Sequence, residues 1–219
     1  MGKKLSLFFL LLVLVVFALP PLFTPPYNTG IRKIEFTVFS ATSVALSLVL
    51  LSISQGKRIA SPTPKDRFSS LILSLKAATF CFAALMLIFA FFQLLSVLSP
   101  LGLDTIQGDI EPPDGVAGWL SFVLALASAA FFEEALYRQF LPQMLIPLLP
   151  QKRAFTVIGE LLCVALFAFA HKGGTLSVLN AAFCAVALRF FRIRSPSLFP
   201  VFAAHFAYNL TLCAFSLLS

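Results

Sequence analysis

Long apolar runs alternate with short polar segments along the whole chain. A bilayer core about 30 Å thick is crossed by a helix of roughly 20 predominantly apolar residues, and several runs reach that length. We therefore predict an all-α fold, a polytopic integral membrane protein with about seven transmembrane helices. The predicted helices cover about residues 5–23, 34–54, 70–98, 118 to at least 138, 154–171, 175–191 and 198–217.

The composition fits this pattern. Of 219 residues, 59% are hydrophobic and only 11% are charged, which is too few to cover the surface of a water-soluble domain. The 26 phenylalanines suit a chain surrounded by lipid. The four cysteines lie inside apolar runs without CxxC spacing, so we expect small buried hydrophobic residues.

The charged residues predict how the chain is oriented. The net charge is +7, but the basic residues lie in short loops and form no basic face, which argues against a nucleic-acid partner. The loop 55–67 holds four basic residues, whereas the loop 99–116 holds four acidic residues and no basic one. By the positive-inside rule we expect a multi-pass protein of the cell or inner membrane, with a cytoplasmic N-terminus and an external acidic loop. The first apolar run reaches Phe23 without an A-x-A site, so we expect an uncleaved helix.

Charged and polar side chains inside these apolar runs are costly in lipid, which makes each of them a candidate functional residue. They cluster in the second half of the chain. The set comprises Glu133, Glu134, Arg138, Glu160, His171, His205 and Asn209.

The segment Glu133-Glu134-x-x-x-Arg138 offers two chemistries. Glu134 and Arg138 share a helix face at i,i+4 and can neutralise each other. Glu133 is then left without a local partner beside two phenylalanines, where an apolar setting favours the role of general base. The alternative is a purely structural Glu–Arg clamp between helices.

Two further segments place polar side chains on one helix face. Phe167-x-x-x-His171 sets a ring above an imidazole, and His205-x-x-x-Asn209 sets an imidazole above an amide. Taken singly, His171 fits an interfacial helix cap, and His205 with Asn209 fits hydrogen bonding between helices. Together with Glu133 they supply a base and oxyanion donors, the set that peptide hydrolysis needs.

The three segments, in this order, resemble the motifs of the CPBP family, the CAAX proteases and bacteriocin-processing enzymes also called Abi proteins. The resemblance covers about residues 117–213, and the segment 194–200 is similar to the family's turn into its last motif helix. It divides the chain into N-terminal transmembrane helices with the acidic loop, 1–116, and a CPBP-type catalytic helical core, 117–219. One residue departs from the family, which often has Gly directly after the arginine, where this chain has Gln139.

The resemblance implies a role for each motif residue. Glu133 and His171 are expected to activate the attacking water, and His205 and Asn209 to form the oxyanion hole. Glu134 and Arg138 are expected to support the site. The predicted helix bounds conflict with this set, because they place Glu133 deep in the bilayer and His171 near its outer face.

A metal is the alternative to a water held directly. Glu133, His171 and His205 would make a two-His, one-carboxylate zinc site with an open position. The chain lacks the H-E-x-x-H helix of many zinc proteases, and such a site would leave no histidine for the oxyanion. We therefore favour a mechanism without a cofactor and keep a divalent metal such as zinc as the alternative.

The sequence thus predicts an intramembrane endopeptidase that hydrolyses a membrane-embedded, membrane-anchored or lipidated protein substrate arriving through the lipid bilayer. A non-catalytic immunity or assembly protein of the same fold is the first alternative. A small transporter with a proton-carrying Glu133 is the second, although we find no inverted repeat.

Overall fold

The computed structural model describes residues 3–23, 33–54, 64–98, 110–171, 174–195 and 197–218, and within them the fold is all-helical. Two elements are π-helical turns, η1 and η2, and η3 is a short 3-10 helix. In chain order the elements are α1 (Lys3–Val13), η1 (Leu14–Ala18), α2 (Pro20–Phe23), α3 (Val38–Ser54), α4 (Pro64–Leu98), α5 (Gly115–Glu133), η2 (Glu134–Phe140), α6 (Leu141–Leu145), η3 (Ile146–Leu148), α7 (Arg153–Ala170), α8 (Thr175–Arg194) and α9 (Phe199–Leu218).

These elements form seven apolar helical segments in the described part of the chain, which confirms the predicted fold class. Five of them are long and apolar enough to cross a membrane: Leu71–Leu98, Gly115–Leu148, Arg153–Ala170, Thr175–Arg194 and Phe199–Leu217. The other two, Leu7–Phe23 and Val38–Ser54, are shorter. The protein is therefore an integral, multi-pass membrane protein.

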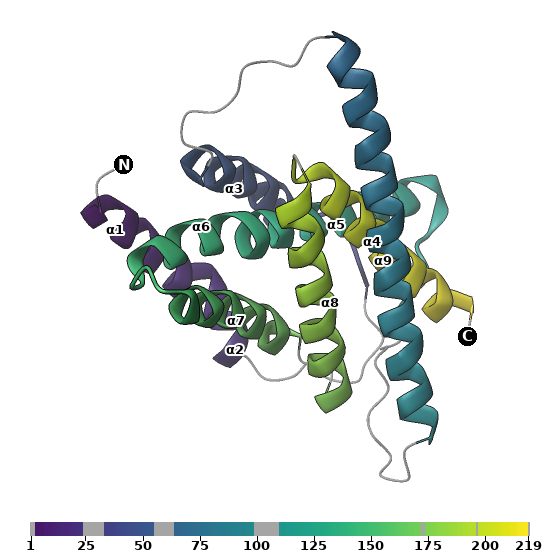
Figure 1. The fold of residues 1–219 in the computed structure, drawn as a ribbon. Helices are drawn as coiled ribbons and strands as arrows, with labels where there is room; N and C mark the ends of the chain where they lie inside the picture. The colour runs from purple at the N-terminus through teal and green to yellow at the C-terminus, as the bar shows by residue number, and fades with distance from the viewer. Residues whose placement is uncertain are drawn as a thin grey trace.

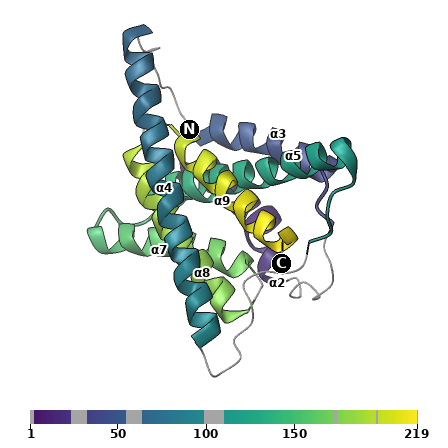
Figure 2. The same cartoon turned by 90° about the vertical axis from the view of Figure 1, so that its right-hand side faces the viewer.

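The helices do not share one direction. The long helix α4 packs along α8 and α9, while α3 and α5 lie side by side and run across α4 (Figures 1 and 2). The fourth helix is longer than the sequence predicted. It starts at Gly115 and continues through η2 and α6 to Leu148, because Pro142 is accommodated directly after the π-helical turn.

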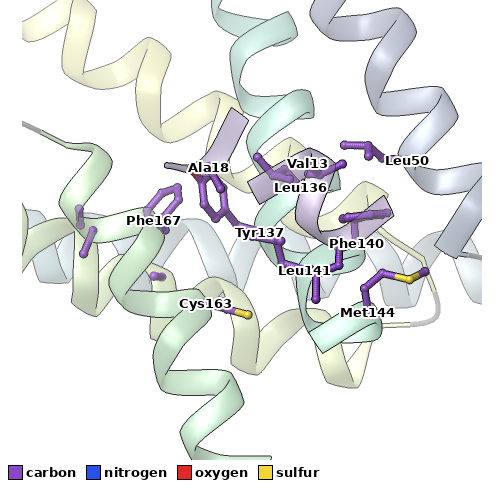
Figure 3. Close-up of a cluster of buried hydrophobic side chains, with 14 residues drawn as sticks. Val13, Ala18, Leu50, Leu136, Tyr137, Phe140, Leu141, Met144, Cys163 and Phe167 are labelled. Atoms are coloured by element: carbon purple, nitrogen blue, oxygen red, sulfur yellow. The ribbon is translucent and has the colours of Figure 1, made fainter. Parts of the chain in front are cut away.

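The largest buried cluster surrounds η2 and α6 (Figure 3). Leu136, Phe140 and Leu141 are each 0% exposed there. They pack against side chains of the first helical segment, α7 and α8, and Leu50 of α3 joins them. The segment that carries the first motif is therefore held from several sides by apolar contacts.

A second buried cluster joins α4, α8 and α9, and a third joins α5 to α9. Helix α9 is thus fixed against α4 and α8 on one side and α5 on another, which places its polar face between the other motif helices. The four cysteines are all buried and free, as predicted.

The segment before α3 lies near the segment before α5. Lys33 pairs with Glu35 at 2.9 Å, and Ile34 and Ile110 pack into one cluster. The hydrogen bond that Lys33 donates to Glu35, and then the charges of Glu35 and Glu111, raise the pKa of Lys33. The two segments therefore lie next to each other, and their placement on one side of the membrane stays a prediction. The rest of the acidic loop, 99–109, lies outside the described residues.

Candidate active site

The two adjacent glutamates lie where the helix changes its geometry. Glu133 ends α5 and Glu134 begins the π-helical turn η2. A π turn places an extra residue in the helix and is common at functional sites. Pro142 lies eight positions beyond Glu134 and has no N–H for the carbonyl of Arg138, four residues before it. The widened turn and the missing donor are two local departures from an ideal helix beside the same motif.

His205 lies between the two glutamates. Its Nδ1 is 2.8 Å from Glu134 Oε1, and its Nε2 is 3.6 Å from Glu133 Oε2. His205 is 4% exposed and Glu134 is 0% exposed, whereas the side chain of Glu133 is 27% exposed. Glu133 lacks a local partner, as its sequence context predicted, but it faces an imidazole from α9.

Arg138 supports Glu134 as the i,i+4 spacing predicted. Its Nη2 is 3.6 Å from Glu134 Oε1, and the guanidinium lies 3.9 Å above the centre of the Phe167 ring. The nearest partner of Glu134 is nevertheless His205, so the carboxylate joins two cationic or donor groups instead of one. Glu134 is therefore the central group of a buried polar cluster drawn from two separate helices.

His171 follows the last residue of α7 and is tied to its own helix. Its Nδ1 is 2.8 Å from the carbonyl oxygen of Phe167. Since a carbonyl only accepts, Nδ1 carries the hydrogen and Nε2 of the neutral ring is left as an acceptor. Gly174, with φ of +94°, then turns the chain into α8, a conformation that favours glycine.

Phe167 brings the two histidines together. Its ring centre is 4.5 Å from that of His171 and 6.2 Å from that of His205. The predicted helix bounds had placed Glu133 and His171 at different depths. In the structure the two are linked through His205, which lies 3.6 Å from Glu133 and next to the Phe167 ring that His171 also contacts.

A cavity of about 130 Å³ lies beside these rings. His171, His205 and Asn209 all line it, so the second and third motifs meet at one space. The other lining residues are Leu85, Phe167, Ser177, Asn180, Ala181, Cys184, Leu188, Tyr208 and Leu212. Glu133 reaches this group through its contact with His205.

A second polar cluster beneath the motif was not predicted. Arg189 donates to both carboxylate oxygens of Glu160, at 2.7 and 2.5 Å, and to the carbonyl oxygen of Arg138 at 3.0 Å. It thereby supplies a donor to the carbonyl that Pro142 cannot reach. Arg192 donates to Oε1 of the buried Gln139.

Helix α8 extends to Arg194, beyond the predicted end of the sixth helix at residue 191. Arg189 and Arg192 therefore lie within the helix, and both side chains pair with other helices. Glu160 is the sequence feature that could have predicted this ion pair, since a carboxylate in an apolar helix needs a cationic partner. The departure at Gln139 also has a structural role, as the acceptor for Arg192.

Among the described side chains, no three His, Cys, Asp or Glu residues gather closely enough to hold a metal ion. In the zinc set considered above, Glu134 contacts Nδ1 of His205, and the Phe167 carbonyl oxygen accepts from Nδ1 of His171. Both histidines therefore keep Nε2 as the nitrogen that could bind a metal, which is how metal-binding histidines are usually held.

No curated protein and no solved structure matches the chain. Residues 115–211 match the Rce1-like family, described as type II CAAX prenyl endopeptidase Rce1-like. This segment contains the three motifs, and the family supports an intramembrane endopeptidase in general terms. This match is consistent with the CPBP family, which the three motifs predicted.

Proposed function

We propose that this protein is an intramembrane endopeptidase that hydrolyses a peptide bond in a membrane-anchored or lipidated protein. The observation that carries the proposal is the position of His205. It contacts both glutamates of the first motif, while it shares a cavity with His171 and Asn209. The candidate acceptor for water and the candidate oxyanion donors therefore line one cavity, and the candidate base lies 3.6 Å from one of them.

In the proposed reaction, Glu133 takes a proton from a water whose oxygen attacks the scissile carbonyl carbon. Nε2 of His171 accepts a hydrogen bond from the same water and orients it. The carbonyl becomes a tetrahedral oxyanion. The C–N bond then breaks as Glu133 returns the proton to the leaving nitrogen, which yields a carboxylic acid and an amine.

The oxyanion is assigned to Nε2 of His205 and the side-chain N–H of Asn209. Because Glu134 accepts from Nδ1, Nε2 can donate only when His205 carries a proton on both nitrogens. Two ionised glutamates, Arg138 and this form of His205 sum to zero net charge. The proposed state is therefore electrically balanced inside an apolar core.

A prenylated CAAX peptide is the first substrate to test, because the matched family is described by that activity. The purified protein would be placed in liposomes with an internally quenched farnesylated CAAX peptide. The same peptide without the farnesyl group and an unrelated transmembrane peptide serve as comparisons. Cleavage of the farnesylated peptide alone would assign a prenyl-dependent substrate, and cleavage of the transmembrane peptide a broader one.

Glu133→Gln tests the proposed base. We expect its turnover to fall by about 10²–10⁴-fold, the usual contribution of general base catalysis. Glu35→Gln is the matched control, since Glu35 is an exposed glutamate paired with Lys33 outside the site. Near-normal turnover by Glu133→Gln would remove Glu133 from the mechanism. A wild-type protein that cleaves none of the peptides would favour the non-catalytic immunity or assembly role.

A further inference from the structure

Three polar side chains outside the motifs meet in the wall of the cavity. Asn180 and Cys184 project from α8 and Tyr208 from α9, and all three line the space that His205 and Asn209 also line. They are 7%, 4% and 5% exposed, respectively. Buried polar groups need hydrogen-bond partners, so the partners of this group show what the cavity can bind.

The three side chains satisfy one another only in part. Asn180 Nδ2 donates to the hydroxyl oxygen of Tyr208 at 3.1 Å. The Cys184 sulfur lies 3.9 Å from that hydroxyl and 4.0 Å from Asn180 Oδ1, and a thiol is a weak partner. An amide and a phenol together hold three donor hydrogens, and this contact uses one of them.

A donor therefore remains in either orientation of the amide. With the amide as placed, the Tyr208 hydroxyl hydrogen and the second amide hydrogen of Asn180 are left over; with the amide reversed, Tyr208 would donate to Asn180 and both amide hydrogens would be left over. Burying such a donor without an acceptor costs about 1–3 kcal/mol. Besides the weak sulfur of Cys184, an acceptor can come from the cavity, as water or a ligand.

The position of Tyr208 indicates that, during turnover, the hydrogen-bond acceptor belongs to the bound ligand. His205, Tyr208 and Asn209 lie on one face of α9, at i, i+3 and i+4, and all line the cavity. A volume of about 130 Å³ far exceeds the roughly 10–15 Å³ that holds one water. A peptide whose scissile carbonyl reaches His205 and Asn209 would bring a neighbouring main-chain carbonyl close to Tyr208, which lies on the same face of α9.

We infer that Tyr208, oriented by Asn180, is a substrate-positioning residue that donates a hydrogen bond to a main-chain carbonyl next to the scissile bond. This inference rests on the proposed endopeptidase function. It assigns the pair a role in binding the peptide backbone and no role in proton transfer.

Tyr208→Phe removes the hydroxyl alone. Loss of one neutral hydrogen bond predicts a rise in KM of about three- to tenfold with little change in kcat. Asn180→Leu should raise KM by a similar factor, and the double variant by no more than the larger single effect, because the two residues act as one unit. Tyr137→Phe is the matched control, since Tyr137 is also 5% exposed and does not line the cavity.

A substrate series tests the carbonyl directly. Single thioamides, which accept hydrogen bonds poorly, would be placed at each position flanking the scissile bond of a cleaved peptide. One position should weaken binding to the wild-type protein by about three- to tenfold and leave binding to Tyr208→Phe unchanged. Binding would be measured with labelled peptide and protein in lipid nanodiscs. Both compared proteins would carry Glu133→Gln, so that the peptide is bound and not cleaved.

The outcomes separate this inference from the proposed function. If the wild type cleaves peptide while Tyr208→Phe keeps its KM and peptide affinity, the hydroxyl only satisfies Asn180 and the inference is wrong. Equal effects of Tyr208→Phe and Tyr137→Phe would also overturn it. The double variant guards against misfolding, because removing both polar partners leaves no unsatisfied group. A wild type that neither binds nor cleaves any peptide overturns the proposed function, and this inference with it.

Discussion

Glu134→Gln should destabilise the fold far more than Glu133→Gln, although the residues are adjacent. Glu134 is 0% exposed and lies 3.6 Å from Arg138, which is 2% exposed. Glutamine keeps the acceptor for His205 but removes the charge that balances the guanidinium. Leaving a buried charge uncompensated costs about 3–5 kcal/mol.

The corresponding cost for Glu133→Gln is small. The Glu133 side chain is 27% exposed, and its 3.6 Å contact with His205 is longer than a hydrogen bond. Partly exposed pairs contribute about 0–1 kcal/mol. The two variants should therefore differ by roughly 3 kcal/mol in the free energy of unfolding.

Thiol exposure on heating provides the assay, because the four cysteines are free and buried and react with a fluorogenic maleimide only on unfolding. Glu134→Gln should lower the midpoint by roughly 10 °C, while Glu133→Gln should stay near the wild type. Adding Arg138→Met to Glu134→Gln should recover part of the loss, since the orphaned charge is gone. Equal midpoints for the two glutamine variants would refute the assignment of Glu134 as the buried counter-ion.

Three further predictions concern other parts of the molecule. Arg189→Gln should lower stability by about 1–3 kcal/mol, and a double-mutant cycle with Glu160→Gln should show strong coupling; additive effects would mean that the pair is not formed. Cysteines at Lys33 and Asp114 should react with an impermeant reagent from one side of the membrane, and cysteines within 57–67 from the other; labelling of all three from one side would overturn the topology. Purified active protein should lack stoichiometric zinc, and activity lost on chelation and restored by zinc would replace the proposed water-activating base with a metal ligand.

The sequence by itself determined the local features of this protein. Long apolar runs predicted the helices, because a bilayer demands them, and their observed bounds differ mainly at the ends. The i,i+4 spacing placed Glu134 beside Arg138 and His205 above Asn209, because helical geometry brings such pairs onto one face. Both placements depend only on residues within one turn of each other.

Only the tertiary structure decided how these faces meet. His205 and Glu134 are 71 residues apart, and no periodicity within either helix shows that Nδ1 and Nε2 of one imidazole face different glutamates. Nor does the sequence show that Arg189 donates to Glu160 and to the carbonyl beneath Pro142. Such contacts depend on the crossing of helices, which is set by the packing of many side chains together. Local pattern therefore supplied the candidate groups, and packing between distant helices supplied their partners.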